Sequence, residues 1–220
     1  QGSYEWENTL ADGLWSYSLD DVEKGLQSSY AELTAVYKAN FGEELKEIDA
    51  IGISAMMHGY LAFDSKDNLL VPFRTWRNTN TEVAADELTE LFEFNVPMRW
   101  SVSHYYQAVL NGEEHIKNVC FLTTLAGYVH YKLTGKKVLG IGDASGMFPI
   151  SDGNYDKDNL AKFNRILKSN GIETPFENIL PQILIAGDNA GTLTTCGAKW
   201  LDPAGKLKPG CMLCPPEGDA

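Results

Sequence analysis

His58 is the first residue whose setting could support chemistry, because it stands between an apolar run and a glycine in "ISAMMHGYLAFD", residues 53–64. An isolated histidine is most often a structural residue of the core. At the carboxyl end of a central strand of an open α/β sheet, however, side chains face the place where ligands bind, and Gly59 would let a ligand approach the backbone. Two interpretations of His58 therefore stay open: a core histidine and a ligand contact.

A second cluster of aromatic and polar residues is "TWRNTNT", residues 75–81. Trp76 offers a flat apolar face to a sugar ring, and Asn78 and Asn80 offer donors and acceptors to its hydroxyl groups. The same residues also suit a core tryptophan and turn-forming asparagines. The cluster thus indicates either a carbohydrate site or an ordinary packed turn.

Several common catalytic motifs are absent from the sequence. "GIGDASG", residues 140–146, lacks the GxGxxG spacing, and neither GxxxxGK[ST] nor GxSxG occurs. The four histidines lack the spacing of a metal-binding pair. "CMLC", residues 211–214, has no second cysteine pair for zinc, and two prolines follow where a redox CxxC would begin a helix. We therefore expect strand cysteines packed in a core, with a zinc or thiol-redox module as the rival interpretation.

The elements that would position these residues alternate between helices and strands. Ser18 and Gly42 have the types that cap a helix between them, and "IDAIGISAM", residues 48–56, is apolar enough for a strand covered on both faces. "YLAFD" and "LLVPF", joined by "SKDN", predict a hairpin. Further helices are expected over residues 81–94, 101–112 and 156–171, and a strand followed by a helix over residues 117–135. This order indicates an α/β or α+β layered domain.

Composition excludes several classes of protein. The chain has 220 residues, a net charge of −12 and no basic run, which disfavours binding to nucleic acid or to an anionic membrane. Its apolar stretches are much shorter than the roughly 20 residues that span a bilayer. Four cysteines in a chain of this size fit a reducing compartment, so we expect a cytoplasmic protein.

Five stretches, in order, resemble the FGGY family of carbohydrate kinases. "AIGISAMMHGYLAFD" resembles the "GISxQMHG" strand and loop of its xylulokinase-like members, and "FRTWRNTNT" is similar to the family's "W-x-D-x-R" element. "YVHYKLTGKKVLGIGDASGMF" resembles "YxxxxLTGxxxTDxSDASGT", "AGTLT" resembles "AGxLT", and "EGDA" is similar to the start of the "GDNAAG" catalytic turn. The resemblance covers essentially the whole chain, and its LTG and DASG elements are the most specific.

This resemblance implies an α/β domain with the ribonuclease H-like fold of actin and hexokinase, in which helices flank a mixed sheet. Residues 1–220 would form the amino-terminal sugar-binding domain of a kinase that phosphorylates a sugar hydroxyl, of a ketose such as xylulose or a related sugar or polyol. Met57 and His58 would contact the sugar, with Trp76 and Asn78 helping to orient it. The aspartate of the GD turn would be the general base, while ATP and Mg²⁺ would be bound mainly by parts outside this chain.

Two GD turns compete for the role of the base. "AGDNAG", residues 186–191, contains Asp188, but its last glycine belongs to the "AGTLT" element, which lies upstream of the catalytic turn in the family. Asp219 follows the apolar run "CMLC", as a base at a strand end should, whereas Asp188 could serve as a turn or helix cap. We favour Asp219. For Asp143, in "DASG", we favour a capping role.

The sequence also departs from the family pattern. The "DxGTxxxR" phosphate hairpin and the carboxy-terminal ATP-binding domain are missing, so we expect a domain that is incomplete at both ends and inactive alone. Asn78 stands where many members carry an acid, and Met56 where glutamine is common, which leaves the sugar open. A homodimer is left open as well, and the rival function is an inactive relative that binds a carbohydrate and regulates a partner.

Overall fold

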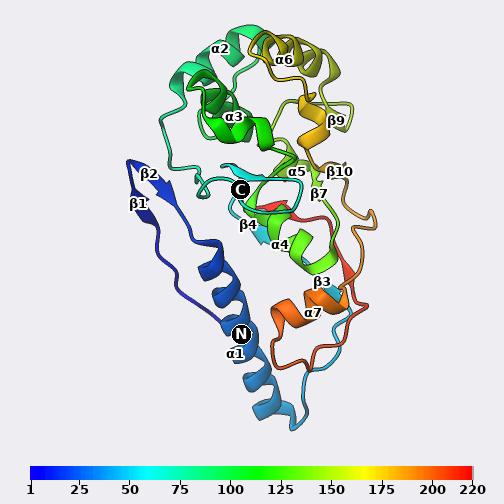
Figure 1. Ribbon diagram of the computed structural model, residues 1–220. Coiled ribbons are helices and arrows are strands. Elements are labelled where there is room, and N and C mark those ends of the chain that lie inside the picture. The colour runs from blue at the N-terminus through cyan, green and yellow to red at the C-terminus, as the bar shows by residue number, and fades with distance from the viewer. Residues whose placement is uncertain (220) are drawn as a thin grey trace.

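The amino-terminal part of the chain consists of a hairpin and a long helix at one edge of the molecule (Figure 1). A computed structural model describes residues 1–219, and Ala220, the last letter of the "EGDA" turn, lies outside the described residues. Strands β1 (Thr9–Ala11) and β2 (Leu14–Ser16) pair antiparallel. Helix α1 (Leu19–Phe41) begins where the Ser18 side chain accepts the Asp21 N–H and ends at Gly42, at φ 75°, as the sequence predicts.

Two pairs of parallel strands form the centre of the fold. The predicted strand over residues 48–56 forms as two short segments, β3 (Ala50–Ile51) and β4 (Ser54–Ala55). They run parallel to β11 (Met212–Leu213) and β12 (Glu217–Gly218), respectively. Because parallel strands end at the same edge, the residues after β4 lie beside the residues after β12. The last residues of the chain thus lie beside β4 near the middle of the molecule, where Figure 1 marks the carboxyl terminus.

The predicted hairpin after β4 forms only in part. Its first arm is β5 (Leu61–Phe63), which pairs antiparallel with β6 (Phe121–Thr123). The second arm makes isolated bridges from Leu69 to Phe63 and from Arg74 to Tyr60 and forms no regular strand. The regular partner of β5 therefore comes from much later in the chain, and all three residues of each strand are buried.

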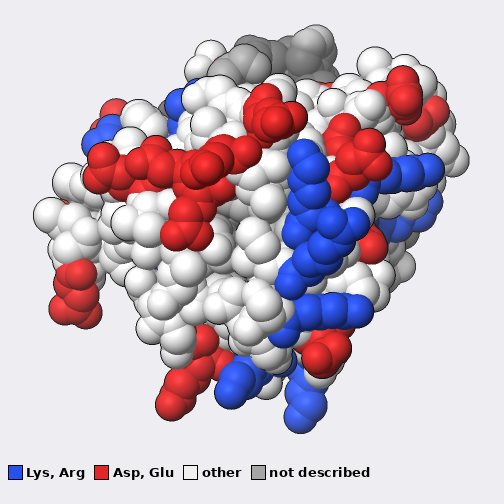
Figure 2. Space-filling model, turned by 90° about the horizontal axis from the view of Figure 1, so that it is seen from above, with Lys and Arg blue, Asp and Glu red and all other residues white. Residues whose placement is uncertain are grey.

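Three helices gather at the far end of the molecule from α1 (Figure 1). They are α2 (Glu82–Phe92), α3 (Ser101–Leu110) and α6 (Lys157–Ser169), joined by two short 3₁₀ turns and by the small hairpin of β8 (Ile150–Ser151) and β9 (Asn154–Tyr155). Phe92, Phe148, Phe163 and Phe176 pack edge to face or tilted against one another in their core. Figure 2 views this end and shows carboxylates and basic side chains in separate bands; α2 is rich in acids and α6 in lysine and arginine.

A further group of elements surrounds the central strands. It comprises α4 (Leu125–Thr134), β7 (Val138–Gly140), α5 (Ile141–Ala144), β10 (Gln182–Leu184) and α7 (Thr195–Leu201), with β10 parallel to β7. Thr124 and Thr194 cap α4 and α7 by accepting the N–H of Gly127 and Gly197. Within residues 1–219, no helix is both long and apolar enough to cross a bilayer.

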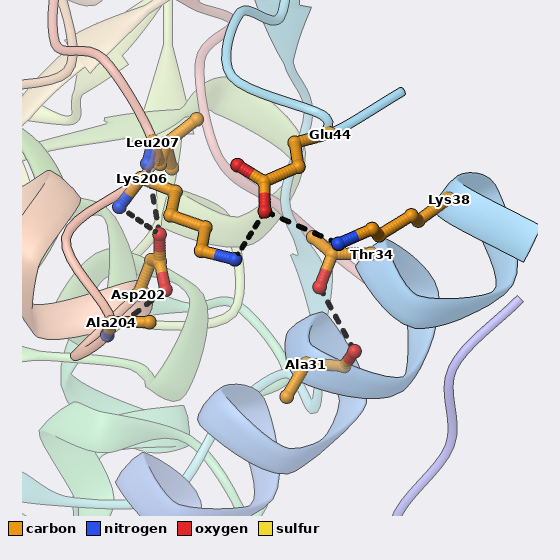
Figure 3. Close-up of polar contacts among 8 residues, drawn as sticks. All are labelled: Ala31, Thr34, Lys38, Glu44, Asp202, Ala204, Lys206 and Leu207. Carbon is orange, nitrogen blue, oxygen red and sulfur yellow. Dashed lines mark hydrogen bonds and ion pairs between the residues drawn. The ribbon is translucent and has the colours of Figure 1, made fainter. Parts of the chain in front are cut away.

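The loop after α7 is organised by Asp202, which is buried beside α1 (Figure 3). Its carboxylate accepts the N–H groups of Ala204, Lys206 and Leu207 at 3.1, 2.7 and 2.8 Å. Glu44, in the loop after α1, accepts the ammonium groups of Lys206 at 2.6 Å and Lys38 at 3.5 Å. These contacts join the end of α1 to the loop that follows α7.

Only one cysteine of "CMLC" packs against the core, so the sequence-based prediction is wrong for Cys214. Cys211 is half-buried and packs against the apolar cluster that contains Leu213, whereas Cys214 is exposed, as the alternation of a strand places residues 211 and 213 on one face and residue 214 on the other. Both thiols are free. Across the described part of the chain, no three histidine, cysteine or acidic side chains converge as metal ligands.

Candidate active site

The backbone at His58 has an unusual conformation. His58 has φ 65°, in the left-handed region that a non-glycine residue rarely occupies, and Gly59 follows with φ 82°. Glycine is required at 59, because a Cβ there would lie 2.6 Å from the Arg74 carbonyl oxygen. The turn is held by the start of α3: the Gly59 N–H donates to the Arg99 carbonyl at 3.0 Å, and the Ser101 hydroxyl donates to the Gly59 carbonyl at 2.7 Å. Strain of this kind persists where the surroundings fix it and is common in binding sites.

The His58 ring packs against the end of α5. Its Nδ1 lies 3.3 Å from the Gly146 carbonyl oxygen, and a Cβ at residue 146 would overlap the imidazole. Burial lowers the pKa of His58, and the charge of Arg99 lowers it further, against the opposing effects of the Gly146 carbonyl and Asp219. His58 is therefore neutral near pH 7. With Nδ1–H directed at Gly146, its Nε2 is left as a hydrogen-bond acceptor.

Asp219 lies directly beside this turn. The Met57 N–H donates to Asp219 Oδ1 at 3.0 Å, which links the residue before His58 to the end of β12. The Ser54 hydroxyl donates to the Gly218 carbonyl at 3.2 Å and supports the same strand pair. The parallel pairing of β4 with β12 thus brings Met57 and His58 next to Asp219, which lies about 160 positions later in the sequence.

A buried carboxyl group lies behind Asp219. Asp143, on α5, is completely buried and accepts the Thr124 hydroxyl at 2.5 Å, while its Oδ1 has no hydrogen-bond partner among residues 1–219. Burial raises the pKa of Asp143 to about 7, and the nearby charges of Glu217 and Asp219 raise it too, against the opposing effect of Thr124. Protonated and ionised forms of Asp143 therefore coexist near neutral pH.

Trp76 and Asp219 line the same cavity, which has a volume of about 490 Å³. Trp76 is 46% exposed, and the Arg77 guanidinium lies over both its ring and that of Trp15, at 5.4 and 5.7 Å. Apolar side chains make up most of the cavity wall; they include Ile51, Ile53, Met56 and Trp200. Met57 and His58 contact Gly146 instead of this wall. Asp219 thus lines the cavity that Trp76 also lines and is bonded to Met57, the residue before His58.

Asn78 and Asp188 are not brought into this group. Asn78 is only 3% exposed; its Oδ1 accepts the Trp15 N–H at 2.8 Å, and its Nδ2 donates to the Trp15 and Thr75 carbonyls. The predicted contact of Asn78 with a sugar stays a prediction. Asp188 is exposed in the loop after β10, where its Oδ2 accepts the Ile185 N–H of the same loop at 2.9 Å.

Sequence reasoning missed the supports of the site. Glu217 accepts the Asp143 N–H at 2.9 Å. Behind Gly59, the Tyr60 hydroxyl lies 2.8 Å from His115 Nε2, and Arg74 forms an ion pair with Glu113. An acid two positions before Asp219 was visible in "EGDA", and the period of a strand places such residues on one face. The pairing of Tyr60 with His115 left no signal in the sequence.

The comparisons with known proteins identify the class. The model of the amino-terminal domain of the FGGY family of carbohydrate kinases matches residues 5–202, and the chain belongs to this family. Solved structures with the same fold include a xylulose kinase from Brucella ovis (20% identity, TM-score 0.76, covering 98% of this chain and 43% of that one). The glycerol kinase of Plasmodium falciparum is another (16% identity, TM-score 0.74, covering 97% and 42%). The fold is therefore the ribonuclease H-like fold of these kinases, as the sequence predicts.

One relative within the family is a xylulose kinase. The xylulose kinase of Staphylococcus xylosus is 24% identical over 216 residues, which cover 85% of this chain and 41% of the relative. The chain thus spans less than half the length of the relatives it matches.

Kinases of this family imply a Mg²⁺ ion, which would need several oxygen ligands. The unpartnered Oδ1 of Asp143 is a hard oxygen donor of the kind that Mg²⁺ prefers, but residues 1–219 assemble no set of three potential ligands. The described residues thus do not by themselves form a magnesium site.

Proposed function

We propose that this chain supplies the sugar site and the catalytic base of an ATP-dependent carbohydrate kinase, which phosphorylates a hydroxyl group of a ketose such as xylulose, or of a related sugar or polyol. The observation that carries the proposal is the Asp219 carboxylate, fixed by the Met57 N–H beside the strained His58 turn. Membership of the FGGY family and the similarity to xylulose kinases support it.

Asp219 would act as the general base. Its carboxylate accepts the proton of the sugar hydroxyl while the hydroxyl oxygen forms a bond to the γ-phosphorus of ATP. The bond from that phosphorus to the bridging oxygen breaks, and ADP leaves with its electron pair. The Met57 N–H holds Oδ1 at 3.0 Å, so the position of the base is set by the backbone.

His58, Met57 and Trp76 would orient the sugar. The Nε2 of neutral His58 accepts a hydroxyl proton, and this requires the imidazole to stay uncharged, as its burial favours. Trp76 offers the exposed face of its ring to the apolar face of the sugar, while Arg77 stacks on the ring and orders it. Met57 packs beside His58 against Gly146 and would close one wall. Asn78 would support the site through Trp15 and Thr75.

The test is sugar-dependent ADP release by the natural gene product that carries this chain, measured on a panel of pentoses, hexoses and polyols. We expect one ketose or polyol to stimulate ADP release and to yield the phosphorylated sugar by mass spectrometry. No stimulation by any member of the panel would overturn the proposed activity.

Replacing the base separates an enzyme from a regulatory relative. Asp219→Asn should lower the turnover number by about 10²–10⁴-fold and leave the sugar dissociation constant within about threefold, because general-base catalysis typically contributes that factor. The control is Asp188→Asn, since Asp188 bonds only within its own loop. Equal activity of the wild type and Asp219→Asn would contradict the role of Asp219. Sugar binding without turnover in the wild type would favour the regulatory alternative. A cytoplasmic location and a homodimer stay predictions.

A further inference from the structure

Glu217 has a specific contact that the proposed chemistry does not use. It lies on β12, two residues before Asp219, and its Oε2 accepts the Asp143 N–H at 2.9 Å. Asp143 belongs to the first turn of α5, and the residue that precedes this helix, Gly140, gives it no side-chain cap. The Glu217 carboxylate therefore supplies, from a distant strand, the acceptor that the start of α5 lacks.

This contact completes a closed circuit of hydrogen bonds around the site. The Gly146 N–H donates to the Asp143 carbonyl at 3.0 Å. The Gly146 carbonyl in turn lies 3.3 Å from His58 Nδ1. Met57, the residue before His58, donates its N–H to Asp219. Asp219 is joined to Glu217 through Gly218 along the chain, which closes the circuit. The circuit thus contains both the proposed base and the proposed sugar-orienting histidine.

We infer that Glu217 is a positioning residue, which fixes the Asp219 carboxylate relative to the His58 ring by tying β12 to α5. This role rests on the proposed function. Glu217 would act through Asp143 and Asp219 and need not touch the sugar. Without this contact, the bond from the Gly140 N–H to the Pro216 carbonyl at 2.8 Å would still join the end of β7 to the residue before β12. The base could then shift with the last residues of the strand while the fold stays intact.

Two glycines provide independent support. A Cβ at Gly140 or at Gly142 would overlap the Glu217 carboxylate. Gly140 has φ −67° and ψ 152°, which any residue adopts, so its backbone conformation does not require glycine. The space is needed by the Glu217 side chain. The space beside the "GIGD" stretch is thus occupied by a carboxylate of the chain itself, that of Glu217.

The surroundings of Glu217 predict which substitutions matter. The charged or titratable groups that face it are Asp143 on α5 and Asp219 at the end of β12, and it forms no ion pair within residues 1–219. An amide oxygen can accept the Asp143 N–H as a carboxylate does. Glutamine at position 217 should therefore keep the hydrogen bond to the Asp143 N–H, and alanine should remove it.

The experiment compares Glu217→Ala, Glu217→Gln and Glu173→Ala in the natural gene product. Glu173 is an exposed glutamate in the loop after α6 and serves as the matched control. We expect Glu217→Ala to lower the turnover number by about tenfold or more with a smaller change in the KM for the sugar, because misplacement by about 1 Å can cost 10²-fold. Glu217→Gln should restore most of the rate, and Glu173→Ala should match the wild type.

A double-mutant cycle with Gly140→Ala tests the mechanism. In the wild type, the added methyl group should push the Glu217 side chain off Asp143 and reproduce the loss seen in Glu217→Ala. In the Glu217→Ala background, the same methyl group meets free space and should cost little more. Equal, additive losses in both backgrounds would overturn the inference.

A readout besides activity keeps the inference testable if turnover is slow. The imidazole ¹⁵N chemical shifts of His58 should change in Glu217→Ala and stay close to wild type in Glu217→Gln, with melting temperatures confirming folded protein. Unchanged rate and unchanged His58 shifts in a folded Glu217→Ala protein would overturn the inference and leave the proposed function standing. A wild type without sugar-dependent activity would instead overturn the proposed function.

Discussion

Two regions of this molecule are built around carboxylates, and their hydrogen bonding differs. At Asp202, three backbone N–H groups converge on one side chain, and the neighbouring Glu44 is paired with two lysines (Figure 3). At the candidate site, Asp143 keeps an unpartnered oxygen, and the nearest charges, those of Glu217 and Asp219, have the same sign as its own. A carboxylate whose acceptors are saturated holds a loop in place. One with spare acceptor capacity and like-charged neighbours can exchange a proton.

The largest stability effect should come from removing the saturated carboxylate. Asp202→Ala leaves the N–H groups of Lys206 and Leu207 without acceptors in a partly buried loop, which should lower the free energy of unfolding by about 2 kcal/mol. Urea denaturation measures this change, with Asp49→Ala, at an exposed residue, as the control. The rate per folded molecule should stay that of the wild type. A lower rate of Asp202→Ala at unchanged stability would show that Asp202 acts on the site and does not merely hold its loop in place.

A pH-dependent effect should distinguish Asp143 from the carboxylates of the other region. Burial raises the pKa of Asp143 to about 7 from an ordinary 3.8, so the folded protein holds a proton there that the unfolded chain releases. The contribution of Asp143 to stability should therefore fall as pH rises from about 4 to about 7 and level off above that. Asp143→Asn should remove this decline.

Melting temperatures of the wild type and Asp143→Asn across this pH range measure the difference. Asp86→Asn, at an exposed acid of α2, is the control and should follow the wild type. Parallel curves for the wild type and Asp143→Asn would show that Asp143 titrates as an ordinary carboxyl group.

The smallest effect should come from Glu44. Glu44 forms surface ion pairs with Lys206 and Lys38. These contacts, that with Lys206 above all, lower the pKa of Glu44, and its carboxylate stays in solvent. Exposed pairs of this kind contribute little, because water and salt screen them. Glu44→Gln should leave both the melting temperature and the turnover number unchanged within error. A clear loss of stability at low salt would show that the Asp202 region depends on charge as well as on backbone donors.

The local elements of the fold were accessible from the sequence. Helix α1 begins and ends at Ser18 and Gly42 as predicted, because capping depends on side chains and conformations within a few residues. The placement of a candidate site after the central strand also followed from local pattern, and Asp219 proved to lie beside Met57.

What escaped prediction depends on contacts between distant segments. The second arm of the expected hairpin makes only isolated bridges to β5 and to Tyr60 before it, and the regular partner of β5 is β6, about sixty residues later. The role of Glu217 depends on space left by two glycines some 75 positions earlier, which no local pattern reports. Cys214 of "CMLC" was misjudged because the alternation of a two-residue strand cannot be assigned without its partner.

The glycine of the GD turn has a consequence for how this sequence can change over evolutionary time. Gly218 does not have a positive φ, yet a Cβ there would overlap Met57 Cγ. Position 218 can therefore accept a larger residue only after position 57 has become smaller, and the reverse order passes through a disfavoured intermediate. The two positions form an epistatic pair, and among homologues a bulky residue at 218 should occur only together with a small one at 57.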